Sequence, residues 1–138
     1  MRVLCLFVCA LIAMAMTGTA FAQDNAPAAA SDVPTYAKEV SRLVQAKCSG
    51  CHHPGGIGPF SLLTYRQTKG WGEMIKEVVS QRRMPPWHAD PAVGRFKNDR
   101  RLTDQEIAMI VKWIDGGRPM GNEADLPVPV KYSEDWRI

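Results

Sequence analysis

Two cysteines and a histidine constrain this chain more than any other feature. Cys48, Cys51 and His52 form the pattern C-x-x-C-H. This spacing is the attachment signature of a c-type haem, because two thiols bond to the two vinyl groups of one porphyrin and the adjacent imidazole reaches the iron. A short chain buries only a modest core of its own, so a large apolar cofactor would stabilise its fold.

Two other interpretations use the same cysteines. An exported Cys-x-x-Cys pair also occurs as a disulfide, which does not need His52. A zinc site needs two further ligands, for which His53 and His88 are the candidates. The haem hypothesis uses all three residues of the motif, and we expect one covalently attached haem c.

The N-terminus has the pattern of a secretory signal peptide. An apolar run over residues 3–16 is followed by small residues ending in Ala-Phe-Ala, so residues 1–22 are predicted to be cleaved before Gln23. The run of about 14 apolar residues is shorter than the roughly 20 that span a bilayer, which argues against a membrane anchor. A lipoprotein site at Cys9 lacks the small residue that would precede it. We expect a periplasmic or otherwise exported protein with no membrane span after cleavage.

The chain beyond the signal peptide is long enough for one small domain. Residues 23–34 are rich in alanine and proline and indicate a flexible leader. The domain is predicted to span residues 35–138, with an irregular tail from about residue 118. Hydrophobic residues make up 46% and charged residues 22% of the chain, which excludes a disordered chain and a many-span membrane protein.

Apolar periodicity predicts helices and no strands. One helix runs from Tyr36 into Cys48, and a second helical stretch begins around Tyr65 and ends before Pro85. The last helix begins at the N-cap Thr103 with a capping-box glutamate three residues on. The fold class is therefore all-α, with about three to five helices around the haem.

Two of these helices are expected to bury one apolar face each. On the second stretch, this face holds Trp71, Met74, Ile75, Val78 and Val79. On the last helix, it holds Ile107, Ile110, Val111 and Ile114.

The second axial position of the iron has several candidate ligands. They are Met74, Met84, Met109, Met120, His53 and His88. Met84 differs from the others, because it comes after the second helical stretch and precedes two prolines that stiffen its loop. His88 is the alternative in the same loop, and it is otherwise a half-exposed loop residue.

The motif, Gly58-Pro59, Met84-Pro85-Pro86 and the helix opening at residues 102–106 together resemble class I cytochrome c, especially its short bacterial members. The resemblance covers roughly residues 36–117. It implies that Met84 is the distal ligand, and that the carbonyl of Pro59 accepts the other hydrogen of the His52 imidazole. It also implies that the first and last helices pack together.

Two longer stretches, residues 53–65 and 83–91, look like haem modules of larger exported proteins. Those modules can sit beside copper-monooxygenase-like or thioredoxin-like domains, whereas we expect no second domain here. Arg82 and Arg83 are the expected partners of the haem propionates. We expect each of three aromatic residues, Trp87, Trp71 and Tyr65, either to hydrogen-bond a propionate or to pack in the core.

Basic residues concentrate in one part of the chain. Residues 66–101 carry nine basic and four acidic side chains, which favours an acidic redox partner, unless the charges simply form a solvated face near the propionates. No nucleic-acid-binding motif is present. The resemblance implies an electron carrier rather than an enzyme. The alternatives are a haem sensor or peroxidase-like enzyme with a labile distal ligand, and an electron-entry subunit of a larger periplasmic oxidoreductase.

Overall fold

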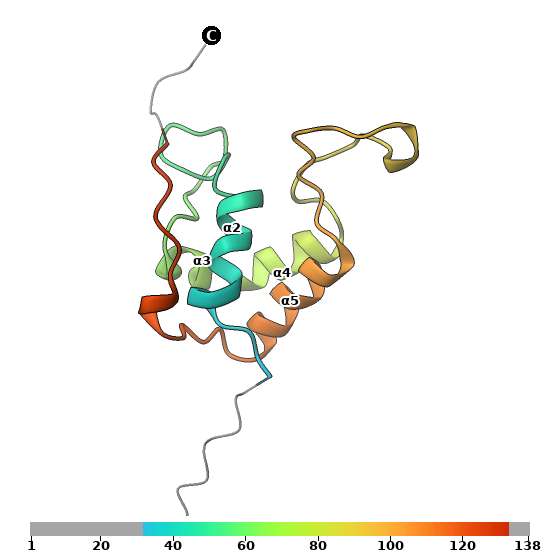
Figure 1. Cartoon of the computed structure of the whole chain (residues 1–138). Coiled ribbons are helices and arrows are strands. Elements are labelled where there is room, and N and C mark those ends of the chain that lie inside the picture. Colours follow the sequence, from blue (N-terminus) through green and yellow to red (C-terminus); the bar gives the residue numbers. More distant parts are fainter. Residues whose placement is uncertain (1–31, 133–138) are drawn as a thin grey trace, which may run out of the picture. The chain divides into compact units, whose positions relative to one another are not determined.

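The computed structural model describes residues 32–132 (Figure 1). The predicted signal peptide and most of the predicted leader lie outside the described residues. The described chain is helical and contains no strand, which confirms the all-α expectation. Its elements are η1 (Tyr36–Val40), α2 (Ser41–Lys47), α3 (Tyr65–Gly70), α4 (Gly72–Ser80), η2 (Pro91–Val93), α5 (Asp104–Asp115) and η3 (Glu123–Asp125). None of these helices has the length and apolar character needed to cross a membrane.

The first helical segment is a π-helical turn that continues into α2. The side-chain oxygen of Thr35 accepts from the Lys38 N–H at 3.3 Å, while the Glu39 carboxylate accepts from the Thr35 N–H at 2.8 Å. This reciprocal capping satisfies donors that a helix start leaves free. The segment ends at Lys47 with Cys48 as its C-cap, so the first thiol lies at a helix end, as predicted.

The second helical stretch is two helices rather than one. Trp71 is both the C-cap of α3 and the N-cap of α4, with φ −93° and ψ 8°. A Cβ on Gly72 would lie 2.4 Å from Nε of Arg118, so only glycine leaves room for that side chain at the corner. The expected apolar face is correspondingly broken. Val79 is buried, but Trp71 and Met74 are 38% and 49% exposed.

The capping box at the start of α5 is present, with Thr103 and Glu106 each accepting from the other's backbone N–H. The buried face of α5 differs from the prediction. Trp113 is fully buried beside Ile110 and Ile114, whereas Ile107 and Val111 are only half-buried. Burial of the indole is stabilised because its Nε1 donates to the Pro119 carbonyl at 3.0 Å.

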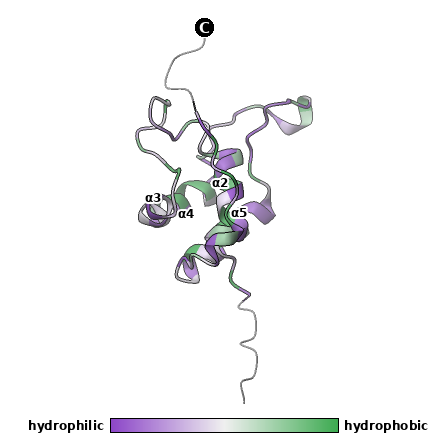
Figure 2. Ribbon diagram, turned by 60° about the vertical axis from the view of Figure 1, so that its left-hand side comes forward, coloured by the Kyte–Doolittle hydropathy of each residue, from purple (hydrophilic) through white to green (hydrophobic). Residues whose placement is uncertain are grey.

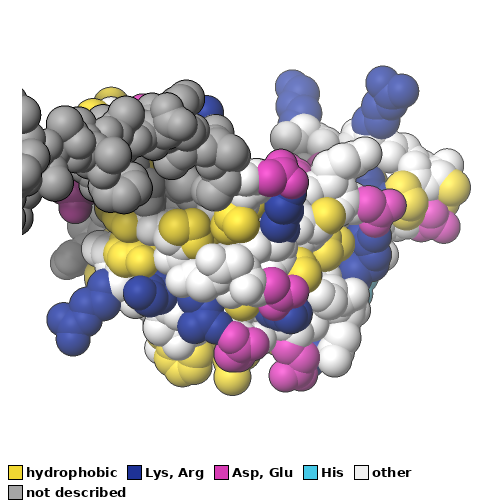
Figure 3. Space-filling model, turned by 90° about the horizontal axis from the view of Figure 1, so that it is seen from below, with side chains coloured by type: hydrophobic (Ala, Val, Ile, Leu, Met, Phe, Trp, Pro, Cys, Tyr) yellow, Lys and Arg dark blue, Asp and Glu magenta, His cyan; other side chains and the backbone are white. Residues whose placement is uncertain are grey.

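Helix α5 packs against α4 on one side and against η1 on another, so the first and last helical segments are in contact, as expected. Figure 2 shows hydrophobic and hydrophilic residues alternating along α2 and α5, the pattern of helices with one buried face. Figure 3 shows acidic and basic side chains beside one another on the face seen from below. Two ion pairs, Lys76 with Asp115 and Arg118 with Glu73, link α4 to the end of α5 and the residues after it.

Candidate haem site

The attachment motif comes directly after α2 and is anchored by a buried serine. Ser49 Oγ donates to the Leu62 carbonyl at 3.0 Å, and the backbone N–H groups of Cys51 and His52 both donate to the Cys48 carbonyl. Cys48 and Cys51 are half-buried free thiols rather than a disulfide. Within residues 32–132, no group of three His, Cys, Asp or Glu side chains lies close enough to hold a metal ion, so the zinc interpretation has no support there.

Before haem attachment, the surroundings of the Cys48 thiol favour its protonated form. Burial raises its pKa to about 11, the neighbouring Cys51 contributes to the rise, and the Arg100 guanidinium opposes both effects. A thiol with a raised pKa carries little thiolate at neutral pH, so it is a poor nucleophile for disulfide exchange. Cys48 therefore lacks the electrostatic setting of a redox-active cysteine.

The carbonyl that accepts a hydrogen bond from His52 belongs to the residue after the predicted Pro59. His52 Nδ1 lies 3.0 Å from the carbonyl oxygen of Phe60, not from that of Pro59. The Gly58 N–H donates to the Cys51 carbonyl and the Leu62 N–H donates to the His52 carbonyl, and these two bonds fold the loop so that Phe60 faces the imidazole. Because a carbonyl only accepts, Nδ1 carries the hydrogen and Nε2 keeps its lone pair for a metal.

A single carbonyl holds the backbone around Met84, just after the end of α4. The N–H groups of Arg83 and Met84 both donate to the Val78 carbonyl, at 2.8 and 3.2 Å. The Met84 side chain is 41% exposed and borders a cavity of about 90 Å³ with Trp87 and Leu102. In Figure 1 the segment after α2 (green) and the segment between α4 and α5 (yellow to gold) both rise toward the top of the view, the first on the left and the second on the right.

The indole N–H of Trp87 is an unsatisfied hydrogen-bond donor within the described part of the chain. Its Nε1 is buried and has no partner among the described residues, while its ring contacts Phe96 edge-on at 5.8 Å. A buried donor without an acceptor costs about 1–3 kcal/mol. A haem propionate is an acceptor of the right kind, so the residues present fit the haem that the motif implies.

The two predicted propionate arginines already have carboxylates of this chain as partners. Arg82 pairs with Asp104 and also donates to the Leu102 carbonyl at 3.4 Å. Arg83 pairs with Glu77 at 2.5 Å. Such exposed pairs contribute little stability, and propionate binding by the two arginines stays a prediction.

The sequence does not predict a contact between the attachment motif and residues 81–103, the loop between α4 and α5 that we call the basic loop. Lys47 Nζ donates to the carbonyls of Asp99 and Arg101 at 3.3 and 3.1 Å. The guanidinium of Arg100 lies so close to Gly50 that a Cβ there would be 2.8 Å from Nη1. Hydrogen bonds from Arg101 also lower the pKa of the Asp99 carboxyl to about 2, so this pair stays charged above that pH. No local pattern in the sequence predicts a contact between residues about fifty positions apart.

The other candidate ligands have different surroundings. Met109 and Met120 pack against the hydrophobic core, whereas His88 is exposed. His53 stacks on Tyr132, with ring centroids 4.4 Å apart and an interplanar angle of 12°. This last contact places the C-terminal tail beside the attachment loop.

Gly58 supplies a test of the His52 geometry. A Cβ at this position would lie 2.6 Å from His52 Nδ1 and 2.9 Å from the Cys51 carbonyl oxygen. We expect Gly58→Ala to destabilise the haem-loaded protein by about 1–3 kcal/mol in denaturant unfolding, because the imidazole or the loop must shift. Gly70→Ala is the matched control, since a Cβ there meets nothing within 4 Å. Equal stability of the two variants would contradict the placement of the imidazole.

A family model described as Cytochrome c matches residues 37–117, more than half of the chain. Comparisons with curated proteins and with solved structures found no significant match. The family carries covalently attached haem c, and Cys48 and Cys51 have the spacing that this attachment requires. This chain therefore belongs to the cytochrome c family, which makes it a haem-based electron-transfer protein whose redox partners are proteins.

Proposed function

We propose that this chain is an exported mono-haem cytochrome c that passes single electrons between redox partners, with His52 and Met84 as its axial ligands. The observation that carries the proposal is the 3.0 Å contact between His52 Nδ1 and the Phe60 carbonyl. This contact leaves Nε2 as the metal-binding nitrogen and fixes the direction in which it points. The bound haem supplies a one-electron couple at its iron.

Met84 has the best position among the methionines. Met109 and Met120 contribute to the core, and Met74 lies on α4. Met84 lies in the loop between α4 and α5, in which Arg100 lies against Gly50 of the attachment motif, and its side chain is not enclosed by protein. A thioether ligand favours the reduced iron and raises its potential, and a closed six-coordinate site denies oxygen and peroxide access. Both effects suit an electron carrier rather than an oxidase or peroxidase.

The alternative of a haem sensor with a labile distal ligand has one observation in its favour. Residues 91–98 of the loop that carries Met84 are all exposed, and an exposed segment opens at a low cost in free energy. Rapid carbon monoxide binding to the reduced protein, without denaturant, would favour the sensor. Slow or absent binding favours the carrier.

The positive charges of the basic loop favour an acidic redox partner. Arg95, Lys97 and Arg100 have no ion pair within residues 32–132, in contrast to Arg82, Arg83 and Arg101. Arg100 also lies against Gly50 of the attachment motif. Unpaired positive charge beside the attached edge of a haem would steer an acidic protein to the position from which electrons pass.

Replacement of Met84 tests the ligation. The oxidised wild type is expected to show the weak long-wavelength absorption band of sulfur bound to ferric iron. Met84→Ala should lose this band, lower the potential and bind exogenous ligands, because no thioether then fills the axial position. His88→Ala is the control in the same loop and should keep the band. A wild-type spectrum without the band, or loss of the band in His88→Ala instead, would place the distal ligand elsewhere.

Charge reversal in the basic loop tests the partner. Lys97→Glu should slow electron transfer to an acidic blue-copper protein by about three- to tenfold at low ionic strength, because it reverses an exposed charge on the basic loop, in which Arg100 lies against Gly50 of the attachment motif. The control Lys38→Glu makes the same change in net charge on η1 and should slow transfer by less than about twofold. Equal slowing by both variants would show that only net charge matters and would contradict docking on this loop.

A further inference from the structure

Three aromatic rings connect the α3–α4 corner to the proximal histidine. The ring of Phe60 lies 4.7 Å from the His52 ring, centroid to centroid, and 4.2 Å from that of Trp71. The Phe60 and Trp71 rings are stacked, with an interplanar angle of 19°. Phe60 is also the residue whose carbonyl accepts from His52 Nδ1. Trp71 therefore contacts the residue that orients the imidazole.

The backbone of Phe60 has few restraints of its own. Hydrogen bonds fix the residues on either side, because Gly58 donates to the Cys51 carbonyl and Leu62 donates to the His52 carbonyl. Between them, Pro59 has no N–H, and the Phe60 N–H has no acceptor among the described residues. The ring of Phe60 packs against the hydrophobic core, and its stack on Trp71 is a second contact that sets the direction of the Phe60 carbonyl.

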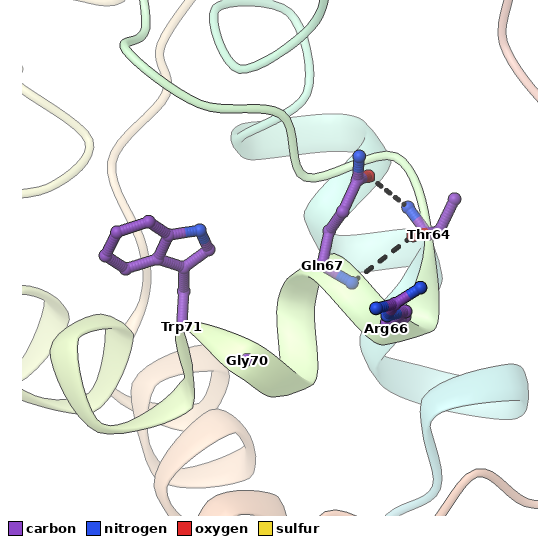
Figure 4. A pocket seen from close by; sticks show the side chains of 5 residues that line it. All are labelled: Thr64, Arg66, Gln67, Gly70 and Trp71. Carbon is purple, nitrogen blue, oxygen red and sulfur yellow. Dashed lines mark hydrogen bonds between the residues drawn. The ribbon is translucent and has the colours of Figure 1, made fainter.

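Trp71, in contrast, is rigidly placed by α3. Gln67 Oε1 accepts from the N–H groups of Leu63 and Thr64 at 2.9 and 3.0 Å, and the Gln67 N–H donates to Thr64 Oγ1 (Figure 4). The Trp71 N–H then donates to the Gln67 carbonyl at 3.2 Å, and its own carbonyl accepts from Ile75 at 2.9 Å. The capping box thereby fixes the corner from which the indole projects.

Core packing does not account for Trp71. The side chain is 38% exposed and borders an open cavity of about 550 Å³ with Thr64, Arg66, Gln67 and Gly70 (Figure 4). Trp71 is absent from the buried cluster that includes Trp113, whereas Phe60 packs against that cluster. The stack on Phe60 is the aromatic contact that the indole makes.

We propose that Trp71 is a positioning residue for the proximal ligand. By stacking on Phe60 it keeps the Phe60 carbonyl within hydrogen-bond distance of His52 Nδ1. That bond sets the tautomer and ring orientation of the imidazole and raises its basicity as a ligand. The inference rests on the proposed ligation of the iron by His52.

Hydrogen exchange of the His52 Nδ1–H, followed by NMR in the haem-loaded protein, tests this role. Trp71→Ala should speed exchange of this hydrogen by about five- to tenfold, because the bond to the carbonyl opens more often. Trp71→Phe keeps an aromatic ring on Phe60 and should restore exchange to within about twofold of the wild type. Leu63→Ala, which truncates another exposed apolar side chain nearby, should leave exchange unchanged.

The indole Nε1–H of Trp113 serves as the internal reference, since it is fully buried and bonded to the Pro119 carbonyl. A general loss of stability would speed exchange at both positions, whereas a positioning role speeds it at His52 alone. Equal acceleration at both, or no acceleration at His52, would overturn the inference. If the wild type itself lacks a haem-shifted His52 Nδ1 resonance, then the proposed ligation fails instead.

Discussion

The hydrogen bond between His52 Nδ1 and the Phe60 carbonyl joins the haem attachment motif to the rest of the fold. On one side, α2 ends at the first cysteine, and Ser49 anchors the next turn to Leu62. On the other side, Trp71 stacks on Phe60 from the α3–α4 corner. Without this bond the imidazole would have two available tautomers and no fixed orientation. The orientation of the His52 imidazole thus depends on the short segment from Gly58 to Leu62.

The opposite side of the site is built differently. Met84 lies in a loop whose backbone is held where it leaves α4, by the Val78 carbonyl, and whose Asp99–Arg101 turn is held by Lys47 before α5 begins. Between these two points the loop is mostly exposed, with its basic side chains in solvent. In the proposed ligation, His52 is firmly positioned and Met84 lies on a longer loop, so the bond from the Met84 thioether is expected to be the weaker of the two axial bonds.

Local signals in the sequence predicted the parts that local chemistry determines. The C-x-x-C-H motif and the capping box of Thr103 and Glu106 each lie within a few residues, so their geometry depends on their spacing. The corner at Trp71 was not predicted, because the apolar periodicity continues across it and the Arg118 side chain that occupies it is remote in sequence. The resemblance implies the carbonyl of Pro59 as the acceptor for His52, whereas the structure has that of Phe60, one residue later. The direction of a carbonyl depends on hydrogen bonds within the loop, and these leave no pattern in the sequence.

The central claim is that one histidine and one methionine of this chain bind the iron of a covalently attached haem. Proton NMR of the reduced protein tests it most directly, because the haem ring current shifts the side-chain resonances of a bound methionine far upfield. We expect one such set of resonances, assigned to Met84, with His52 as the partner imidazole. Absence of these resonances, or their assignment to Met74, Met109 or Met120, would contradict the claim.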